Sequence, residues 1–336
     1  MSLLKQIVSF FGAKDETLIV PYIGYASDKK IFLKGRVLKN KGISTNPSNS
    51  KLRNLINTYK RFETDEIGCI DINVLVNGQQ FDLTTDEEGY FWIDGEWDAP
   101  PLDQSGIWLK TQFNITNKDR GNKDGVTAIG EIHYSTGNFE YGIISDIDDT
   151  VLLSHVTSRL KWKMLYLTLF KDAFGRKPVL GIVRFLTTLV KGSDGQQSNP
   201  IFYVSHSPWN LYDSIIQFLD IQNLPKGPVL LRDYGLRPSG AFGDHKEETI
   251  RHILTTYPNK QFILLGDSGE KDADYYLQIA QEFPNRIKAI YIRKIRDGRN
   301  ASRINELIAQ HADVDILLSD TSEKFIKHAR EIGLIA

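Results

Sequence analysis

The second half of the chain alternates short, uninterrupted apolar runs with amphipathic segments, and this alternation limits the possible folds most strongly. Apolar runs that carry almost no polar residue are typical of strands covered on both faces. Six such runs are expected to be strands, at residues 141–146, 200–205, 228–233, 261–267, 287–292 and 314–320. The segments between and after them show helical spacing, at residues 178–190, 208–219, 245–257, 272–283, 301–311 and 321–333. The pattern predicts a doubly wound α/β domain over residues 141–336.

The first half of the chain has a different pattern, in which short alternating strands are separated by turn residues. Asn77-Gly78 is the strongest of these signals, because this pair favours a two-residue hairpin turn. The pattern predicts a β-sandwich, immunoglobulin-like or transthyretin-like, over residues 18–140. A helix is expected to be inserted at residues 49–61, and residues 1–17 are expected to form a helical segment.

Composition excludes several broad classes of protein and partner. The chain has 336 residues, of which 41% are hydrophobic and 25% charged, as in ordinary globular proteins. Its net charge of −1 gives no reason to expect a nucleic-acid partner. Cys69 is the only cysteine, so an intramolecular disulfide is impossible and a reducing, cytoplasmic location is expected. No apolar run approaches the ~18–20 residues of a membrane-spanning helix.

Polar residues gather where the apolar runs of the second half end. Because ligands of such sheets bind outside the carboxyl ends of the strands, these residues are candidates for one site. They are Asp146, Asp148, Asp149 and Thr150 after the first run, Ser205, His206 and Ser207 after the second, Arg232 at the third, and Asp267, Ser268 and Asp272 at the fourth. Lys246, near the start of the helix before the fourth run, joins them.

Three carboxylates at one sheet edge repel each other unless a cation lies among them, and oxygen ligands favour Mg²⁺ when phosphate also binds. Asp146 is expected to bind the ion and to attack phosphorus as a nucleophile. Asp148 is expected to act as general acid and then base, with its backbone carbonyl on the metal. Asp267 would complete the metal site, with Asp272 as a further ligand or as a supporting neighbour. These residue types predict phosphoryl transfer.

A second group of residues is expected to hold the phosphate. Ser205 with its neighbouring backbone N–H groups, His206 and Thr150 would bind its oxygens, and Lys246 would balance charge on the phosphate and on the nucleophile.

Four further residues have open roles. Asp149 either shapes the turn or orients Asp148 or a metal-bound water. Ser207 either caps the following helix or contacts phosphate. Arg232 either pairs with a neighbouring carboxylate or contacts substrate, and Ser268 is a possible neighbour of the substrate.

The motifs DIDDTV, a strand ending in serine, a helical lysine and GDSGEKD, in this order, resemble the four motifs of the haloacid-dehalogenase superfamily. The segment DIDDT, together with YVSHSPWNLY and LLGDSGEKDADYY, resembles, more narrowly, the catalytic domain of the actin-patch-associated phosphatidate phosphatase family. The upstream GYAS…GRVL segment, which leads into the β-rich region, resembles the bacterial members of that family. The resemblance implies a Rossmann-like haloacid-dehalogenase domain and Mg²⁺-dependent conversion of phosphatidate to diacylglycerol. It carries over to Asp146, Asp148, Thr150, Ser205, Lys246, Asp267 and Asp272.

A basic, apolar segment at about residues 152–177 follows the first acidic motif. Six lysines and arginines face one aspartate there, among many aromatic and aliphatic residues. In the superfamily that the chain resembles, inserts at this point cover the active site. The segment is expected to be a lid, either packed on its own domain or also resting on an anionic membrane surface.

The expected function is therefore hydrolysis of a phosphomonoester through an aspartyl-phosphate on Asp146, with phosphatidate as the favoured substrate. Two alternatives stay open. One is a phosphatase for a soluble phosphomonoester or a phosphoprotein. The other is a non-catalytic binding protein whose phosphatase site is vestigial.

Overall fold

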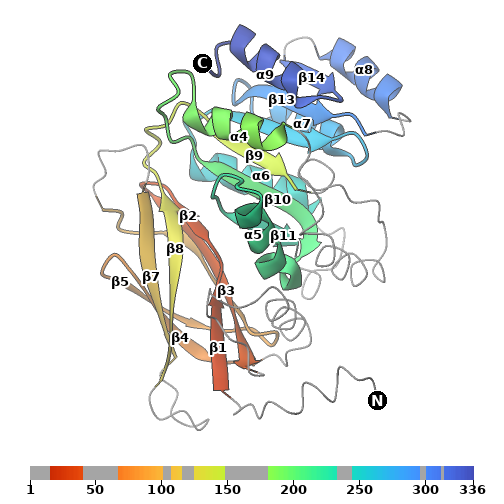
Figure 1. The fold of residues 1–336 in the computed structure, drawn as a ribbon. Coiled ribbons are helices and arrows are strands. Elements are labelled where there is room, and N and C mark those ends of the chain that lie inside the picture. Colours follow the sequence, from red (N-terminus) through yellow and green to blue (C-terminus); the bar gives the residue numbers. More distant parts are fainter. Residues whose placement is uncertain are drawn as a thin grey trace, which may run out of the picture. The chain divides into compact units, whose positions relative to one another are not determined.

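The computed structural model describes residues 16–40, 67–100, 107–115, 125–147, 181–232, 244–295, 300–311 and 314–336. The chain divides into two compact units (Figure 1). The first comprises Met1–Tyr25, Lys30–Asp98 and Trp108–Ile132, and the second Ala26–Lys29, Ala99–Ile107 and His133–Ala336, each without its undescribed residues. The predicted helix at residues 49–61, the lid at 152–177 and nearly all of the segment at 1–17 lie outside the described residues, as do Asp148, Asp149 and Thr150.

Strands β1 to β8 form one hydrogen-bonded network in the order β1-β3-β2-β8-β7-β4-β5, with β6 paired to β3. Their bounds are β1 Glu16–Pro21, β2 Gly24–Ala26, β3 Lys30–Asn40, β4 Asp71–Val76, β5 Gln79–Thr84, β6 Tyr90–Glu96, β7 Ile107–Ile115 and β8 Val126–Tyr134. The pairs β1–β3, β3–β6, β4–β5 and β4–β7 are antiparallel. The predicted hairpin is confirmed, because Asn77 and Gly78 join β4 to β5 with positive φ angles of 46° and 84°.

The second unit alternates strands with helices, as predicted. Its strands are β9 Gly142–Asp146, β10 Ile201–Pro208, β11 Val229–Arg232, β12 Phe262–Asp267, β13 Ile287–Arg293 and β14 Ile316–Ser319. Its helices are α4 Ile182–Lys191, the short helix η2 Trp209–Leu211, α5 Tyr212–Ile221, α6 His245–Thr256, α7 Asp272–Glu282, α8 Ala301–Gln310 and α9 Ser322–Glu331. Every neighbouring pair in this sheet is parallel.

The strand order of this sheet is β11-β10-β9-β12-β13-β14. The chain therefore moves outward from β9 through β10 to β11, and then returns to build β12 on the other side of β9. In open parallel sheets the crevice for a ligand opens where the order reverses, at the carboxyl ends of the strands. The topology thus directs attention to the ends of β9 and β12.

Aromatic side chains pack helices onto both faces of the parallel sheet. On β12, Phe262 contacts Tyr257, which follows α6, with ring centroids 6.4 Å apart. On β13, Tyr291 contacts Phe185 of α4 at 5.0 Å and Phe325 of α9 at 5.2 Å. Tyr291 pairs with Leu265 of β12, which comes three residues after Phe262. Because side chains alternate between the two faces along a strand, the rings of Phe262 and Tyr291 lie on opposite faces of the sheet.

The expected helix cap at Ser207 is wrong. Strand β10 continues to Pro208, which pairs with Arg232 after a shift in register. Helix η2 begins at the next residue, Trp209, with Pro208 rather than Ser207 in the capping position and no side-chain cap, and α5 follows from Tyr212. The Ser-Pro pair therefore indicated the start of the helical segment to within one residue, but pairing with β11 keeps Ser207 in the strand.

No helix in the described ranges is both long enough and apolar enough to cross a membrane.

Candidate active site

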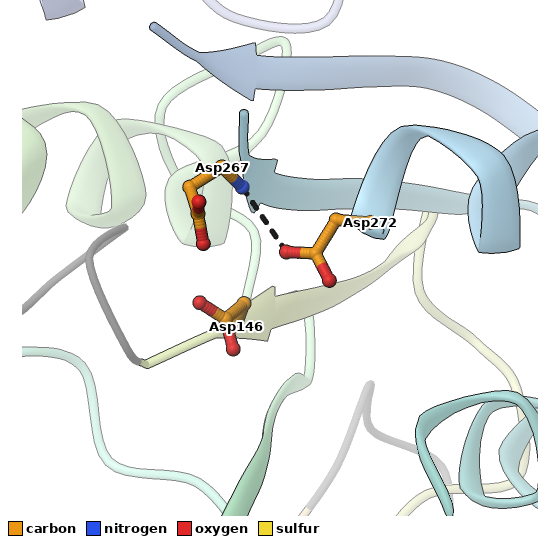
Figure 2. Close-up of side chains that lie close together, drawn as sticks. All are labelled: Asp146, Asp267 and Asp272. Carbon is orange, nitrogen blue, oxygen red and sulfur yellow. Dashed lines mark hydrogen bonds between the residues drawn. The ribbon is translucent and has the colours of Figure 1, made fainter. Parts of the chain in front are cut away.

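Three aspartates converge where β9, β12 and α7 meet (Figure 2). Asp146 is the last residue of β9, Asp267 the last of β12, and Asp272 the first of α7. Their relative exposures are 1%, 0% and 0%, and one carboxylate oxygen from each lies within 4.8 Å of the others. The sheet therefore brings together, away from solvent, three acidic residues that are far apart in the sequence.

The glycine before Asp267 makes this approach possible. A Cβ atom at Gly266 would lie 2.6 Å from the Cβ atom of Asp272 and closer still to its Oδ2 atom. Oδ2 of Asp272 accepts the backbone N–H of Asp267 at 3.1 Å, as the dashed line in Figure 2 shows. The Gly-Asp pair of the acidic motif thus lets the start of α7 fold back onto the end of β12.

Lys246, in the first turn of α6, supplies a buried positive charge to this cluster. Its Nζ atom lies 2.8 Å from Oδ1 of Asp146, 2.8 Å from Oδ1 of Asp272 and 2.7 Å from Oε2 of Glu270. Burial by itself lowers the pKa of Lys246, but these three carboxylates raise it well above its usual range. The ammonium therefore stays charged at 1% exposure, held by its acidic neighbours.

The carboxyl groups themselves titrate unusually. Burial, followed by the charge of Asp272, raises the pKa of Asp267 to about 8, and burial raises the pKa of Asp272. Burial also acts to raise the pKa of Glu270, but its hydrogen bond to His206 and the charge of Lys246 lower it to about 2. The ionised forms of Asp267 and Asp272 are thus disfavoured where they lie, and a cation bound among them would stabilise these forms.

The oxygen atoms of the three aspartates fit a hard divalent cation. Oδ1 of Asp267 accepts the backbone N–H groups of Gly269 and Glu270, whereas its buried Oδ2 has no hydrogen-bond partner in the described part of the chain. Buried polar atoms are normally satisfied, so such an oxygen suits a bound ion. Carboxylate-only donor sets of this kind favour Mg²⁺ over softer metals.

The end of β10 lies beside this cluster and contributes Ser205 and His206. Ser205 is fully buried, and its Oγ atom accepts the backbone N–H of Ser207 at 2.9 Å. His206 lies between two carboxylates, with Nε2 2.6 Å from Oδ1 of Asp244 and Nδ1 3.2 Å from Oε2 of Glu270. Burial by itself lowers the pKa of His206, but these two hydrogen bonds raise it to about 9.

Two other residues that the sequence suggested for the site, Ser268 and Arg232, lie outside the aspartate cluster. Ser268 joins the end of β12 to the segment after β13, since its Oγ atom accepts the backbone N–H of Ile295 at 2.9 Å. Arg232 ends β11, which is two strands from β9 in the sheet order. The structure therefore groups Asp146, Asp267, Asp272 and Lys246, with Ser205 and His206 on the neighbouring strand.

Sequence reasoning missed two acidic residues of the site. Asp244 precedes α6 and caps it, accepting the backbone N–H of Lys246 at 3.0 Å. Glu270 lies inside GDSGEKD, between the two aspartates that drew attention. A capping signal before α6 was available for Asp244, but nothing local indicated that Glu270 would reach Lys246.

Comparison with known proteins gives one family match within the second unit and two curated relatives of the chain. Residues 141–294 match the family described as "Phosphatidate phosphatase APP1, catalytic domain". Phosphatidate phosphatase APP1 of Saccharomyces cerevisiae is 31% identical over 220 residues, covering 62% of this chain and 34% of the yeast protein. An uncharacterized protein of Schizosaccharomyces pombe is 26% identical over 226 residues, covering 64% of this chain and 35% of that protein. The chain spans about a third of the length of these curated relatives.

Solved structures resemble the chain only loosely. A carbohydrate acetylesterase from Xanthomonas citri gives a TM-score of 0.28 at 9% identity, covering 87% of this chain and 75% of that one. β-Glucuronidase 3 of Bacteroides uniformis gives 0.23 at 11% identity, covering 90% and 38%. Scores this low carry no argument about fold or function.

Proposed function

We propose that this chain acts as a member of the phosphatidate phosphatase APP1 family, because residues 141–294 match the model of that family's catalytic domain and the yeast protein is 31% identical over 220 residues. The proposed activity is Mg²⁺-dependent hydrolysis of phosphatidate to diacylglycerol and inorganic phosphate. The observation that carries it is the convergence of Asp146, Asp267 and Asp272 around Lys246 at the edge of the parallel sheet.

The proposed chemistry begins at Asp146. A carboxylate oxygen of Asp146 attacks phosphorus, the bond from phosphorus to the ester oxygen breaks, and Asp148 gives its proton to the leaving alkoxide. A water molecule then attacks the phosphorus of the aspartyl-phosphate, its proton passes to Asp148, and the bond to Asp146 breaks to release phosphate. Asp148 lies outside the described residues, so its role rests on the sequence motif.

The remaining groups would hold charge and geometry during these steps. Asp146 and Asp267 would bind Mg²⁺, with Asp272 as a further ligand or as the group that orients Lys246. When bound, the ion would balance negative charge on the transferring phosphoryl group. Lys246 would stabilise charge on Asp146 and on the phosphoryl oxygens, and Ser205, His206 and Thr150 are proposed to contact the phosphate.

We also propose that the second unit is a Rossmann-like domain of the haloacid-dehalogenase type. The reversal of strand order at β9 supports this, as does the placement of Asp146 and Asp267 at the adjacent ends of β9 and β12. For the first unit we propose a β-sandwich, which the antiparallel pairs β1–β3, β3–β6, β4–β5 and β4–β7 support. A cytoplasmic location and contact between residues 152–177 and an anionic membrane remain proposals from the sequence alone.

The test compares substrates with and without metal. The full chain would be assayed with Mg²⁺ or EDTA on phosphatidate in mixed micelles, on an aryl phosphate and on a sugar phosphate. We expect Mg²⁺-dependent release of phosphate, with phosphatidate preferred, and none from Asp146→Asn. Preference for a soluble phosphomonoester would keep the reaction but reject the lipid substrate. Inactivity on every phosphate would reject the function and favour a binding protein.

The intermediate has its own test. After acid quenching of a reaction with radiolabelled substrate, the label should be found on the peptide that contains Asp146. A label on any other residue would reject Asp146 as the nucleophile.

A further inference from the structure

The ammonium group of Lys246 contacts three carboxylates, and only two of them belong to the aspartate cluster. Its Nζ atom donates hydrogen bonds to Oδ1 of Asp272 at 2.8 Å and to Oε2 of Glu270 at 2.7 Å, and it forms an ion pair with Oδ1 of Asp146 at 2.8 Å. A lysine ammonium has three N–H donors, so these two hydrogen bonds fix the direction of two of them. The hydrogen bond to Glu270 therefore helps to determine where the ammonium lies relative to Asp146.

Glu270 also links Lys246 to the end of β10. The same Oε2 atom lies 3.2 Å from Nδ1 of His206, and Nε2 of His206 lies 2.6 Å from Oδ1 of Asp244. Oδ1 of Asp244 accepts the backbone N–H of Lys246, and its Oδ2 accepts the hydroxyl of Tyr275 at 3.0 Å. These contacts form a closed ring that holds Lys246 at both its backbone nitrogen and its side-chain nitrogen.

We propose that Glu270 is a positioning residue, whose carboxylate, braced by His206 and Asp244, directs the ammonium of Lys246 toward Asp146. The proposal rests on the proposed function for its kinetic consequences, and on the structure alone for the position of Nζ. In this proposal, the ring of contacts from Asp244 through His206 to Glu270 holds the long, flexible side chain of Lys246 in one rotamer.

Glu270 is much more exposed than Lys246, so an experiment can separate the positioning role of Glu270 from a role in folding. The side chain of Glu270 is 37% exposed, whereas that of Lys246 is 1% exposed. Truncation of Glu270 therefore removes little packing from the core, but it leaves one N–H of a buried ammonium without this acceptor. Displacement of a charge-stabilising group by about 1 Å costs on the order of 100-fold in rate.

The first test needs no turnover. Crystal structures of the wild type and of Glu270→Ala at neutral pH would compare the distance from Nζ of Lys246 to Oδ1 of Asp146. We expect the 2.8 Å contact of the wild type to be lost or lengthened in the variant. An unchanged contact would overturn the proposal. Because this readout needs no substrate, it remains decisive even if the wild type hydrolyses no phosphate.

The second test separates positioning from metal or substrate binding. On an aryl phosphate at saturating Mg²⁺, we expect Glu270→Ala to lower kcat about 10- to 100-fold with KM changed less than about 3-fold. Glu270→Gln, which keeps an acceptor oxygen, should recover part of this loss. Full recovery of Glu270→Ala by higher Mg²⁺ would assign Glu270 to the metal site and overturn the proposal, as would a loss confined to KM.

A double-mutant cycle and a matched control complete the design. If Glu270 acts through Lys246, then Glu270→Ala should have less than about a 2-fold further effect in a Lys246→Met background. Additive losses would contradict the proposal. The control is Glu282→Gln, which removes a carboxylate from the other end of α7, where it pairs with Arg251 at 2.7 Å. It should leave kcat unchanged.

Discussion

Nζ of Lys246 lies 2.8 Å from Oδ1 of Asp146, and both side chains are almost completely buried. One is the last residue of a strand, and the other comes 100 positions later, in the first turn of a helix. Charge buried in this way is stable only while its partners remain, so removal of either group should have large and measurable effects.

Lys246→Met should destabilise the protein strongly. The substitution leaves Asp146, Asp272 and Glu270 without their shared cation, and breaking a buried ion pair from one side typically costs about 3–5 kcal/mol. Denaturant unfolding in EDTA measures the loss. Lys324→Met, which breaks an exposed pair with Asp320, should change stability by less than about 0.5 kcal/mol. Similar small losses for both variants would contradict the buried cluster.

Asp267→Asn should change the response to Mg²⁺ rather than simply weaken the protein. Without metal, removal of one of three crowded carboxylates relieves repulsion, so the variant should be as stable as the wild type or more stable. With millimolar Mg²⁺, the wild type should gain in Tm and the variant should not. Thermal scans with and without Mg²⁺ measure this difference. Asp274→Asn is the control, because Asp274 lies in the first turn of α7, pairs with Arg303 and is not one of the three clustered aspartates, so it should show the wild-type response to Mg²⁺. An equal Mg²⁺ response in Asp267→Asn would remove Asp267 from the metal site.

Gly266→Ala should damage the site through sterics alone. The added Cβ would collide with the side chain of Asp272, so α7 or β12 must shift, at a cost of about 1–3 kcal/mol. Gly95→Ala is the matched control, because a Cβ there meets no atom within 4 Å. Urea unfolding compares the two variants, and Mg²⁺ titration of Tm reports whether the aspartates remain together. A Gly266→Ala protein as stable as Gly95→Ala would show that α7 does not need this close approach.

His206 predicts a pH dependence of stability with a defined sign. Its pKa is raised to about 9 by Asp244 and Glu270, so the folded state holds this proton more tightly than the unfolded state. The contribution is complete below about pH 6.5 and is lost as pH rises through about 9, by at most about 3 kcal/mol.

The measurement for His206 is the free energy of unfolding at pH 6 and at pH 9.5. The wild type should lose stability between these values, and His206→Asn should lose less. His311→Asn, on the segment after α8, should keep the wild-type slope. Identical slopes in all three proteins would mean that the imidazole gains no proton affinity on folding.

Much of the second unit was predictable because its local signals agree. Each buried strand is a short apolar run, and each helix shows its own periodicity, so the six strands and the helices between them followed from the order of residues. The polar ends of the first and fourth runs also predicted that Asp146 and Asp267 lie at the same edge, since parallel strands share their carboxyl side.

The sequence by itself determined which elements form and which residues end them, because backbone geometry and side-chain burial act over a few neighbouring positions. Only the tertiary structure decided which strands are neighbours, because buried apolar strands resemble one another and the sequence does not encode their order locally. The same holds for Glu270 and His206, whose roles depend on long-range contacts between a loop, a strand end and a helix. Ser207 shows the same difference, since long-range pairing with β11 keeps Ser207 and Pro208 in strand β10, and the helical segment that these two residues indicate begins at Trp209.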